Sequence, residues 1–181
     1  MTHGSYNLHE VIYKNRNMTA FDYSLDFKTI DFRQHPELYR VGKGEQGVLL
    51  VEPYKSEILP YWRFKTPDIA KESSQKIYEL FLNYLAAGDF VGADMARKFL
   101  QMGYTRSRRY ANHKSGRKYK SNPQKVTSPD AKLQARKDIL PYEVDPIKAE
   151  SAAIFKEKWV QAKTDEKYLQ LMAKHKQMYK G

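Results

Sequence analysis

Apolar residues recur at helical spacing in the middle of the chain. Five of them fall three and four positions apart and so share one face of a helix: Ile77, Leu80, Phe81, Tyr84 and Leu85. The capping run at residues 66–68 (Thr-Pro-Asp) begins this helix and Gly88 ends it. A second helix follows from about Asp89 to Gly103. The pattern therefore predicts an αα-hairpin with a tight turn at residues 88–89.

Before residue 66 the apolar pattern favours strands. Aromatic and aliphatic residues alternate with polar ones over residues 21–27, as in a half-buried strand, although Asp22 and Asp26 fit an irregular extended segment equally well. The run Val48–Val51 predicts a short buried strand, and residues 58–64 an edge or bulged strand around Pro60. We therefore predict an α+β fold, in which a small strand and hairpin layer packs on the αα-hairpin.

After residue 103 the chain predicts further helices joined by a polar linker. A short helix is expected over residues 105–113, and the pairs Ser128-Pro129 and Asp145-Pro146 each begin another. The last helix is amphipathic, with Thr164-Asp165 as a candidate break. The predicted organisation is an N-terminal arm at residues 1–20, an α+β core at 21–120, and a linker with a helical C-terminal extension at 121–181.

Composition excludes several classes of protein and site. The 181 residues contain no cysteine, which excludes a disulfide framework, a thiolate zinc site and a cysteine nucleophile. The longest aliphatic run is far too short to span a bilayer, and no signal peptide is visible. We expect a cytoplasmic protein that does not enter a membrane. The scattered histidines give no metal-binding pair, so no metal and no cofactor are predicted.

The net charge of +11 is concentrated in one stretch of the chain. Ten basic residues and no carboxylate lie between Met95 and Pro129, a composition that favours phosphate binding. The sequence thus predicts a nucleic-acid interface, for DNA or RNA, over Arg97–Lys120. The expected contacts are Arg97, Lys98, Tyr104, Arg106, Arg108, Arg109, Tyr110, His113, Lys114, Arg117 and Lys118. A site for an acidic protein and a plain solvated face remain the alternatives.

Residues 42–47 spell a literal G-x-G-x-x-G, with Gly42, Lys43, Gly44 and Gly47 as candidate phosphate contacts. In dinucleotide-binding folds this motif opens a helix, whereas here it runs into the apolar segment predicted as a strand. The favoured interpretation is a hairpin or bulged turn with residues at positive φ. A nucleotide-binding loop is the alternative, with His113 or an aspartate in the chemistry.

Two long segments resemble a known family. They are IDFRQHPELYRVGKGEQGVLLVEPYKSEILPYWRFKTP, at residues 30–67, and DFVGADMARKFLQMGYTRSRRYANHKSGRKY, at residues 89–119. The region from Phe21 to about Tyr119 is similar to small bacterial, phage and fungal proteins described only as a domain of unknown function. The resemblance implies no activity, cofactor or catalytic residue.

The function expected from the sequence is a basic nucleic-acid-binding protein without enzymatic activity. Two alternatives remain open. One is an enzyme that acts on a nucleotide or nucleic acid through the Gly42–Gly47 loop. The other is a structural or assembly protein, for example of a phage particle, that self-associates or binds a partner through its C-terminal helix.

Overall fold

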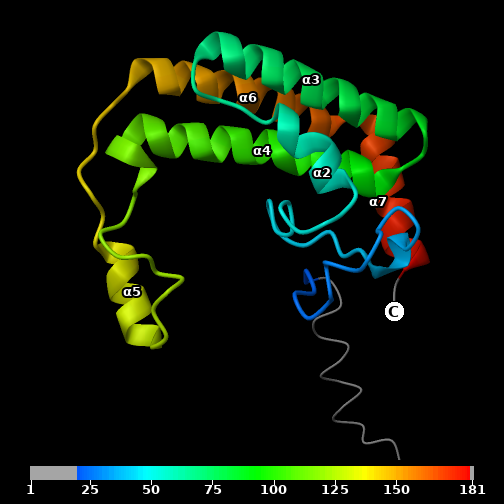
Figure 1. The fold of residues 1–181 in the computed structure, drawn as a ribbon, viewed down its shortest axis with the longest axis horizontal. Coiled ribbons are helices and arrows are strands. Elements are labelled where there is room, and N and C mark those ends of the chain that lie inside the picture. The colour runs from blue at the N-terminus through cyan, green and yellow to red at the C-terminus, as the bar shows by residue number, and fades with distance from the viewer. Residues whose placement is uncertain (1–19, 180–181) are drawn as a thin grey trace, which may run out of the picture.

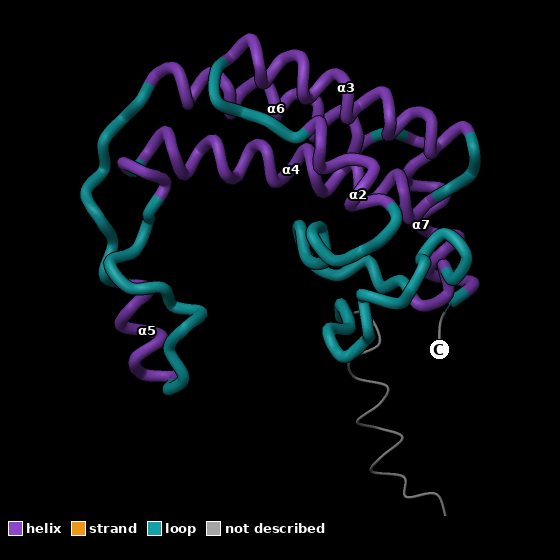
Figure 2. The backbone as a smooth tube through the Cα atoms, viewed as in Figure 1, coloured by secondary structure: helices purple, strands orange, loops and turns teal. Residues whose placement is uncertain are grey.

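The computed structural model describes residues 20–179, and in this range the fold is helical (Figures 1 and 2). Six α-helices follow in chain order: α2 (Tyr54–Ile58), α3 (Pro67–Ala86), α4 (Phe90–Asn112), α5 (Pro129–Lys137), α6 (Pro146–Thr164) and α7 (Glu166–Met178). Short 3-10 turns lie at Pro36–Leu38, Leu59–Tyr61 and Lys114–Gly116. None of these helices combines the length and the apolar character needed to cross a bilayer. The arm predicted at residues 1–20 lies almost wholly outside the described residues.

The predicted hairpin of α3 and α4 forms the centre of the fold. The Thr66 side chain accepts a hydrogen bond from the Ile69 N–H and begins α3, and Asp89 caps α4 by accepting from the Gly92 N–H. Gly88, at φ +69°, makes the turn between the two helices. Every residue from Phe90 to Leu100 is buried, because α4 is covered on several sides.

The helix predicted to stop at Gly103 instead continues to Asn112. A glycine inside a helix costs only about 1 kcal/mol, so it does not end one by itself. At this position it also allows close packing: a Cβ on Gly103 would lie 2.2 Å from Cδ1 of Phe155 in α6. The predicted helix at residues 105–113 is therefore the last part of α4.

The predicted strand layer is wrong, because the described residues form no sheet. Their one β-type pairing is an isolated antiparallel bridge between Tyr119 and Ile139. Residues 48–51 form turns whose N–H groups bond to carbonyls a few residues earlier, as Val51 does to Gly47, and lead into α2. Residues 58–64 comprise the end of α2, a 3-10 turn and an irregular segment. A short apolar run fits a buried helical segment as well as a strand. Here the local hydrogen bonds select turns and helix.

Residues 21–33 follow a chain of turns instead of a strand. The carboxylates of Asp22, Asp26 and Asp31 each accept a hydrogen bond from the backbone N–H two residues later, at 2.9, 3.2 and 2.9 Å. Aspartate stabilises turns in this way, and each bond competes with strand pairing. Asp22 and Asp26, which fit an irregular segment as well as a strand, thus stabilise turns, and Asp31 stabilises another.

Helices α6 and α7, which the sequence placed in a C-terminal extension, complete the core. Helix α6 packs along both α3 and α4, and α7 crosses the end of the bundle (Figure 1). Phe155, Ala162 and Tyr168 are buried in the same hydrophobic cluster as the residues of α3 and α4. The predicted break at residues 164–165 is present, with Asp165 capping α7.

Residues 114–145, here called the protrusion, extend away from the bundle. They leave the end of α4, carry α5 at their tip and return to the start of α6 (Figure 1). The two connections are held together by the Leu140 N–H donating to the Lys118 carbonyl at 2.9 Å and the Lys120 N–H to the Asp138 carbonyl at 3.0 Å. The basic end of α4 and the protrusion therefore form one continuous region.

Candidate nucleic-acid interface

The structure divides the predicted basic surface into a buried and an exposed part. Arg97 and Lys98 are buried, and the Lys98 side chain has no exposed surface. Arg97 donates to Asp94 from Nη2 at 2.6 Å and from Nε at 3.0 Å. Lys98 donates from Nζ to the carbonyls of Val41 and of Gln46, the latter at 2.6 Å. Neither side chain is available to a phosphate in this arrangement.

Asp94 is the centre of this buried polar cluster. Its carboxylate also accepts hydrogen bonds from the hydroxyls of Tyr39, at 2.5 Å, and Tyr168, at 2.7 Å. Burial by itself raises the pKa of the Asp94 carboxyl, but Arg97, Lys98 and the two hydroxyls outweigh it and lower the pKa to about 2. Burial lowers the pKa of Lys98 to about 8. The cluster joins α4 to α7 and to the segment before α2.

A pH titration of stability tests this cluster. A carboxyl whose pKa is lower in the folded than in the unfolded state stabilises the fold above its unfolded pKa, and this contribution is lost as the pH falls to the folded pKa. For Asp94 the window runs from 3.8 down to about 2. We expect the free energy of unfolding to fall across it by about 2–3 kcal/mol from this group alone. Denaturant unfolding at each pH measures the loss, and a flat profile would contradict the assignment.

The glycine-rich loop is fastened to α4 by the buried cations. Gly42, Gly44 and Gly47 all have positive φ, as the turn interpretation requires. The Gly44 carbonyl accepts from Arg97 at 3.0 Å, and the Gln46 carbonyl accepts from Lys98.

Phosphate-binding loops present backbone N–H groups, whereas here those of Lys43, Gln46 and Val48 already donate within the loop. The geometry therefore favours a structural turn over a nucleotide-binding loop.

Three of the predicted nucleic-acid contacts, two tyrosines and one histidine, make contacts within the fold. Tyr104 stacks on Trp159 of α6, with ring centroids 5.7 Å apart. His113 is buried, and its Nδ1 lies 3.1 Å from the Pro141 carbonyl oxygen. Tyr110 is 40% exposed and its ring packs against Phe64. Within residues 20–179 no three histidine, aspartate or glutamate side chains gather in a way that could hold a metal ion.

The remaining predicted cations are exposed on the last turns of α4 and in the protrusion: Arg106, Arg108, Arg109, Lys114, Arg117 and Lys118. A cavity of about 510 Å³ lies between the end of α4, the loop that follows it and α5. Its charged lining is entirely basic and comes from three segments: Arg106, Arg109, Arg117, Lys118 and Arg136. The structure thus brings four predicted residues together with one that the sequence prediction missed.

Arg136 is the residue that sequence analysis overlooked. It lies in the last turn of α5 beside Lys137, within the segment predicted as a C-terminal extension. The available signal was this basic helix end, but the fold is needed to place it beside α4. Asp138, the nearest carboxylate in sequence, pairs with Lys120 at 3.4 Å and does not line the cavity.

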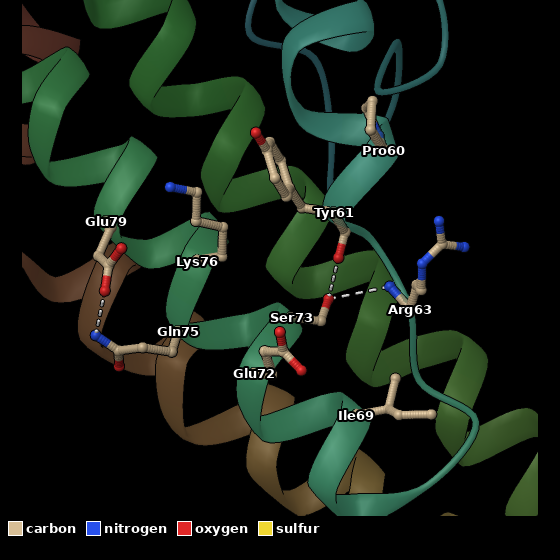
Figure 3. A pocket seen from close by; sticks show the side chains of 9 residues that line it. All are labelled: Pro60, Tyr61, Arg63, Ile69, Glu72, Ser73, Gln75, Lys76 and Glu79. Atoms are coloured by element: carbon tan, nitrogen blue, oxygen red, sulfur yellow. Dashed lines mark hydrogen bonds between the residues drawn. The ribbon is translucent and has the colours of Figure 1, made fainter.

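A second groove, of about 570 Å³, lies along α3 and differs in charge (Figure 3). Glu72 and Glu79 line it together with Arg63 and Lys76, so it favours neither sign of ligand charge. The Ser73 hydroxyl donates to the Tyr61 carbonyl at 2.6 Å and accepts from the Arg63 N–H at 3.0 Å, which ties the wall of the groove to α3. The basic cavity is therefore the stronger candidate for an anionic ligand.

Comparison with known proteins gives one match. The family model described as Domain of unknown function (DUF4385) matches residues 22–178. No curated protein and no solved structure matches the chain. The family match extends the similarity beyond residue 119, over the protrusion, α6 and α7, in agreement with their place in the same fold.

Proposed function

Since the chain belongs to the family Domain of unknown function (DUF4385), we propose its function from the geometry of the site: it binds nucleic acid, DNA or RNA, through the end of α4 and the protrusion. The single observation that carries this function is the cavity whose charged lining is entirely basic. Arginine presents a planar fork of donors that matches phosphate oxygens, and four of the five cations are arginines. The cytoplasmic location expected from the sequence stays a prediction.

The surroundings of the cavity add to its charge. From Arg106 to Asp138 the sequence has eleven basic residues and two acidic ones, Asp130 and Asp138. Nucleic acid releases condensed counterions when such a surface neutralises its phosphates, which gives affinity without sequence specificity. We therefore expect binding through the backbone, in which base contacts add a smaller contribution.

No catalytic step or cofactor is part of this function. The enzyme alternative depended on the Gly42–Gly47 loop, whose backbone groups are engaged by the loop itself and by α4. The assembly alternative used the C-terminal helix to bind a partner, and in this fold buried residues of α6 and α7 pack in the protein's own core. An acidic protein partner stays a competing expectation, because it would be attracted by the same cations.

Charge reversal of the cavity is the direct test. We expect the triple variant Arg106→Glu, Arg109→Glu, Arg117→Glu to weaken nucleic-acid binding at least about a hundredfold, because three charged hydrogen-bonding contacts are replaced by repulsion. Fluorescence anisotropy with labelled DNA and RNA over a series of salt concentrations measures the loss. For the wild type, the slope of log affinity against log salt should approach about −4.5 on duplex DNA if all five cations contact phosphate.

A matched triple variant controls for net charge. Lys28, Lys71 and Lys167 are exposed and lie away from the cavity, so their replacement by glutamate changes the total charge equally. We expect this control to keep most of the affinity. Equal losses in the two triple variants, or no binding by the wild type at low salt, would refute a site at the protrusion.

A further inference from the structure

We propose that the basic cavity holds one unpaired nucleotide, so that the protein prefers single-stranded over double-stranded nucleic acid. This inference rests on the proposed function and names its substrate class. It depends on lining residues of the cavity that are not charged: Tyr119, Asn122, Pro123 and Gln124. A surface that bound only phosphate would need none of them.

Tyr119 supplies an aromatic wall on which a base can stack. Tyr119 forms the isolated backbone bridge with Ile139, so the pairing at the base of the protrusion fixes the position of Tyr119. The Lys118 ammonium lies over the Tyr119 ring, 5.4 Å from its centroid, which places positive charge at this aromatic wall. Stacking of bases on aromatic rings, next to cations that follow the backbone, is the usual way in which proteins hold single strands.

Two amide side chains that line the cavity can read the edge of a base. The Asn122 Oδ1 accepts from the Gln124 N–H at 2.9 Å, which sets the turn that brings both residues to the cavity. The exposed Gln124 amide has no hydrogen-bond partner among the described residues, so it offers both a donor and an acceptor. Such an amide can pair with a base edge that is free of its Watson–Crick partner.

The cations that line the cavity can hold the phosphate. Arg106 and Arg109 come from α4 and Arg136 from α5, so guanidinium groups reach the cavity from two helices. The cavity volume of about 510 Å³ lies within the usual range of small-molecule sites, roughly 300–1,000 Å³. In a duplex the bases are stacked and paired in the interior, whereas a single strand can turn one base outward into such a cavity.

The test compares single strands with a duplex and varies the aromatic wall. The probes are an oligo-dT, an oligo-U, an oligo-A and a blunt DNA duplex of equal length, measured by anisotropy at one salt concentration. We expect the wild type to bind the single strands at least about tenfold more tightly than the duplex. Tyr119→Leu should lose about 5- to 150-fold on single strands only. Tyr119→Phe keeps the ring and should keep the affinity.

Two further variants test whether a loss of affinity comes from the cavity itself. Tyr142→Leu removes another exposed tyrosine of the protrusion that does not line the cavity, and it should bind like the wild type. Gln124→Ala changes an exposed loop residue without disturbing a bonded side chain, so it tests the cavity even if Tyr119→Leu disturbs the bridge. We expect it to reduce the difference in affinity between oligo-A and oligo-U.

The outcomes distinguish a failure of the nucleotide cavity from a failure of nucleic-acid binding as a whole. A duplex bound as tightly as the single strands would overturn the nucleotide cavity and leave nucleic-acid binding in place. The same conclusion follows if Tyr119→Leu and Gln124→Ala both match the wild type on every single strand. No binding of any probe would overturn both. A preference between oligo-dT and oligo-U identifies DNA or RNA as the source of the nucleotide and supports the cavity in either case.

Discussion

Replacing Asp94 with asparagine is expected to lower the free energy of unfolding by about 3–5 kcal/mol. The Asp94 side chain is fully buried, and it is the counter-charge for Arg97 and Lys98, whose side chains are 10% and 0% exposed. The substitution leaves the two cations without a counter-charge, and the new amide nitrogen is itself a donor directed at other donors. The cost of an uncompensated buried charge far exceeds that of one lost hydrogen bond.

Urea or guanidinium unfolding followed by circular dichroism measures this loss. Asp138→Asn is the matched control, because Asp138 pairs with Lys120 at 3.4 Å near the surface, with both side chains about half exposed. Exposed pairs contribute only about 0–1 kcal/mol. A loss below about 1 kcal/mol for Asp94→Asn would show that the buried cluster does not hold the fold together.

Replacing Phe155 with alanine should destabilise the protein by a similar amount, about 3–5 kcal/mol. The Phe155 ring has no exposed surface and lies against Gly103 of α4. Truncation removes the buried apolar area and leaves a cavity that rigid helices cannot fill completely. If α6 were an extension outside the core, the same change would have little effect.

Val160→Ala in the same helix is the control, since Val160 is 38% exposed and loses less buried surface. We expect thermal and denaturant unfolding to remain a single cooperative transition in both variants, because α3, α4 and α6 share one hydrophobic cluster. A separate early transition of α6 and α7 in the wild type would contradict this description.

The sequence predicted the helices well where local signals determine them. The N-caps at Thr66, Ser128 and Asp145, each followed by proline, begin helices as expected, and Gly88 makes the turn between α3 and α4. These signals act within one turn of the chain, so they need no knowledge of the fold. The strand predictions failed because an apolar run such as residues 48–51 fits two structures, and only its surroundings distinguish them.

The prediction of the basic surface also depended on contacts between distant segments, which a local pattern does not encode. The sequence identified a stretch rich in cations and free of carboxylates, but it could not separate Arg97 and Lys98 from the exposed cations. The spacing of Asp94 to both residues, three and four positions, was the available sign of an internal pairing. Lysine and arginine are rarely buried, so composition alone favours exposure for both.

By itself, then, the sequence determined where most helices begin, where the chain turns and where positive charge is concentrated, because capping, turn geometry and charge are local properties. Only the tertiary structure decided which cations face solvent. Packing buried Arg97 and Lys98 against Asp94, and the return of the chain through α5 placed Arg136 beside Arg106 and Arg109. Burial and convergence depend on contacts between segments far apart in the chain, and no local pattern encodes them.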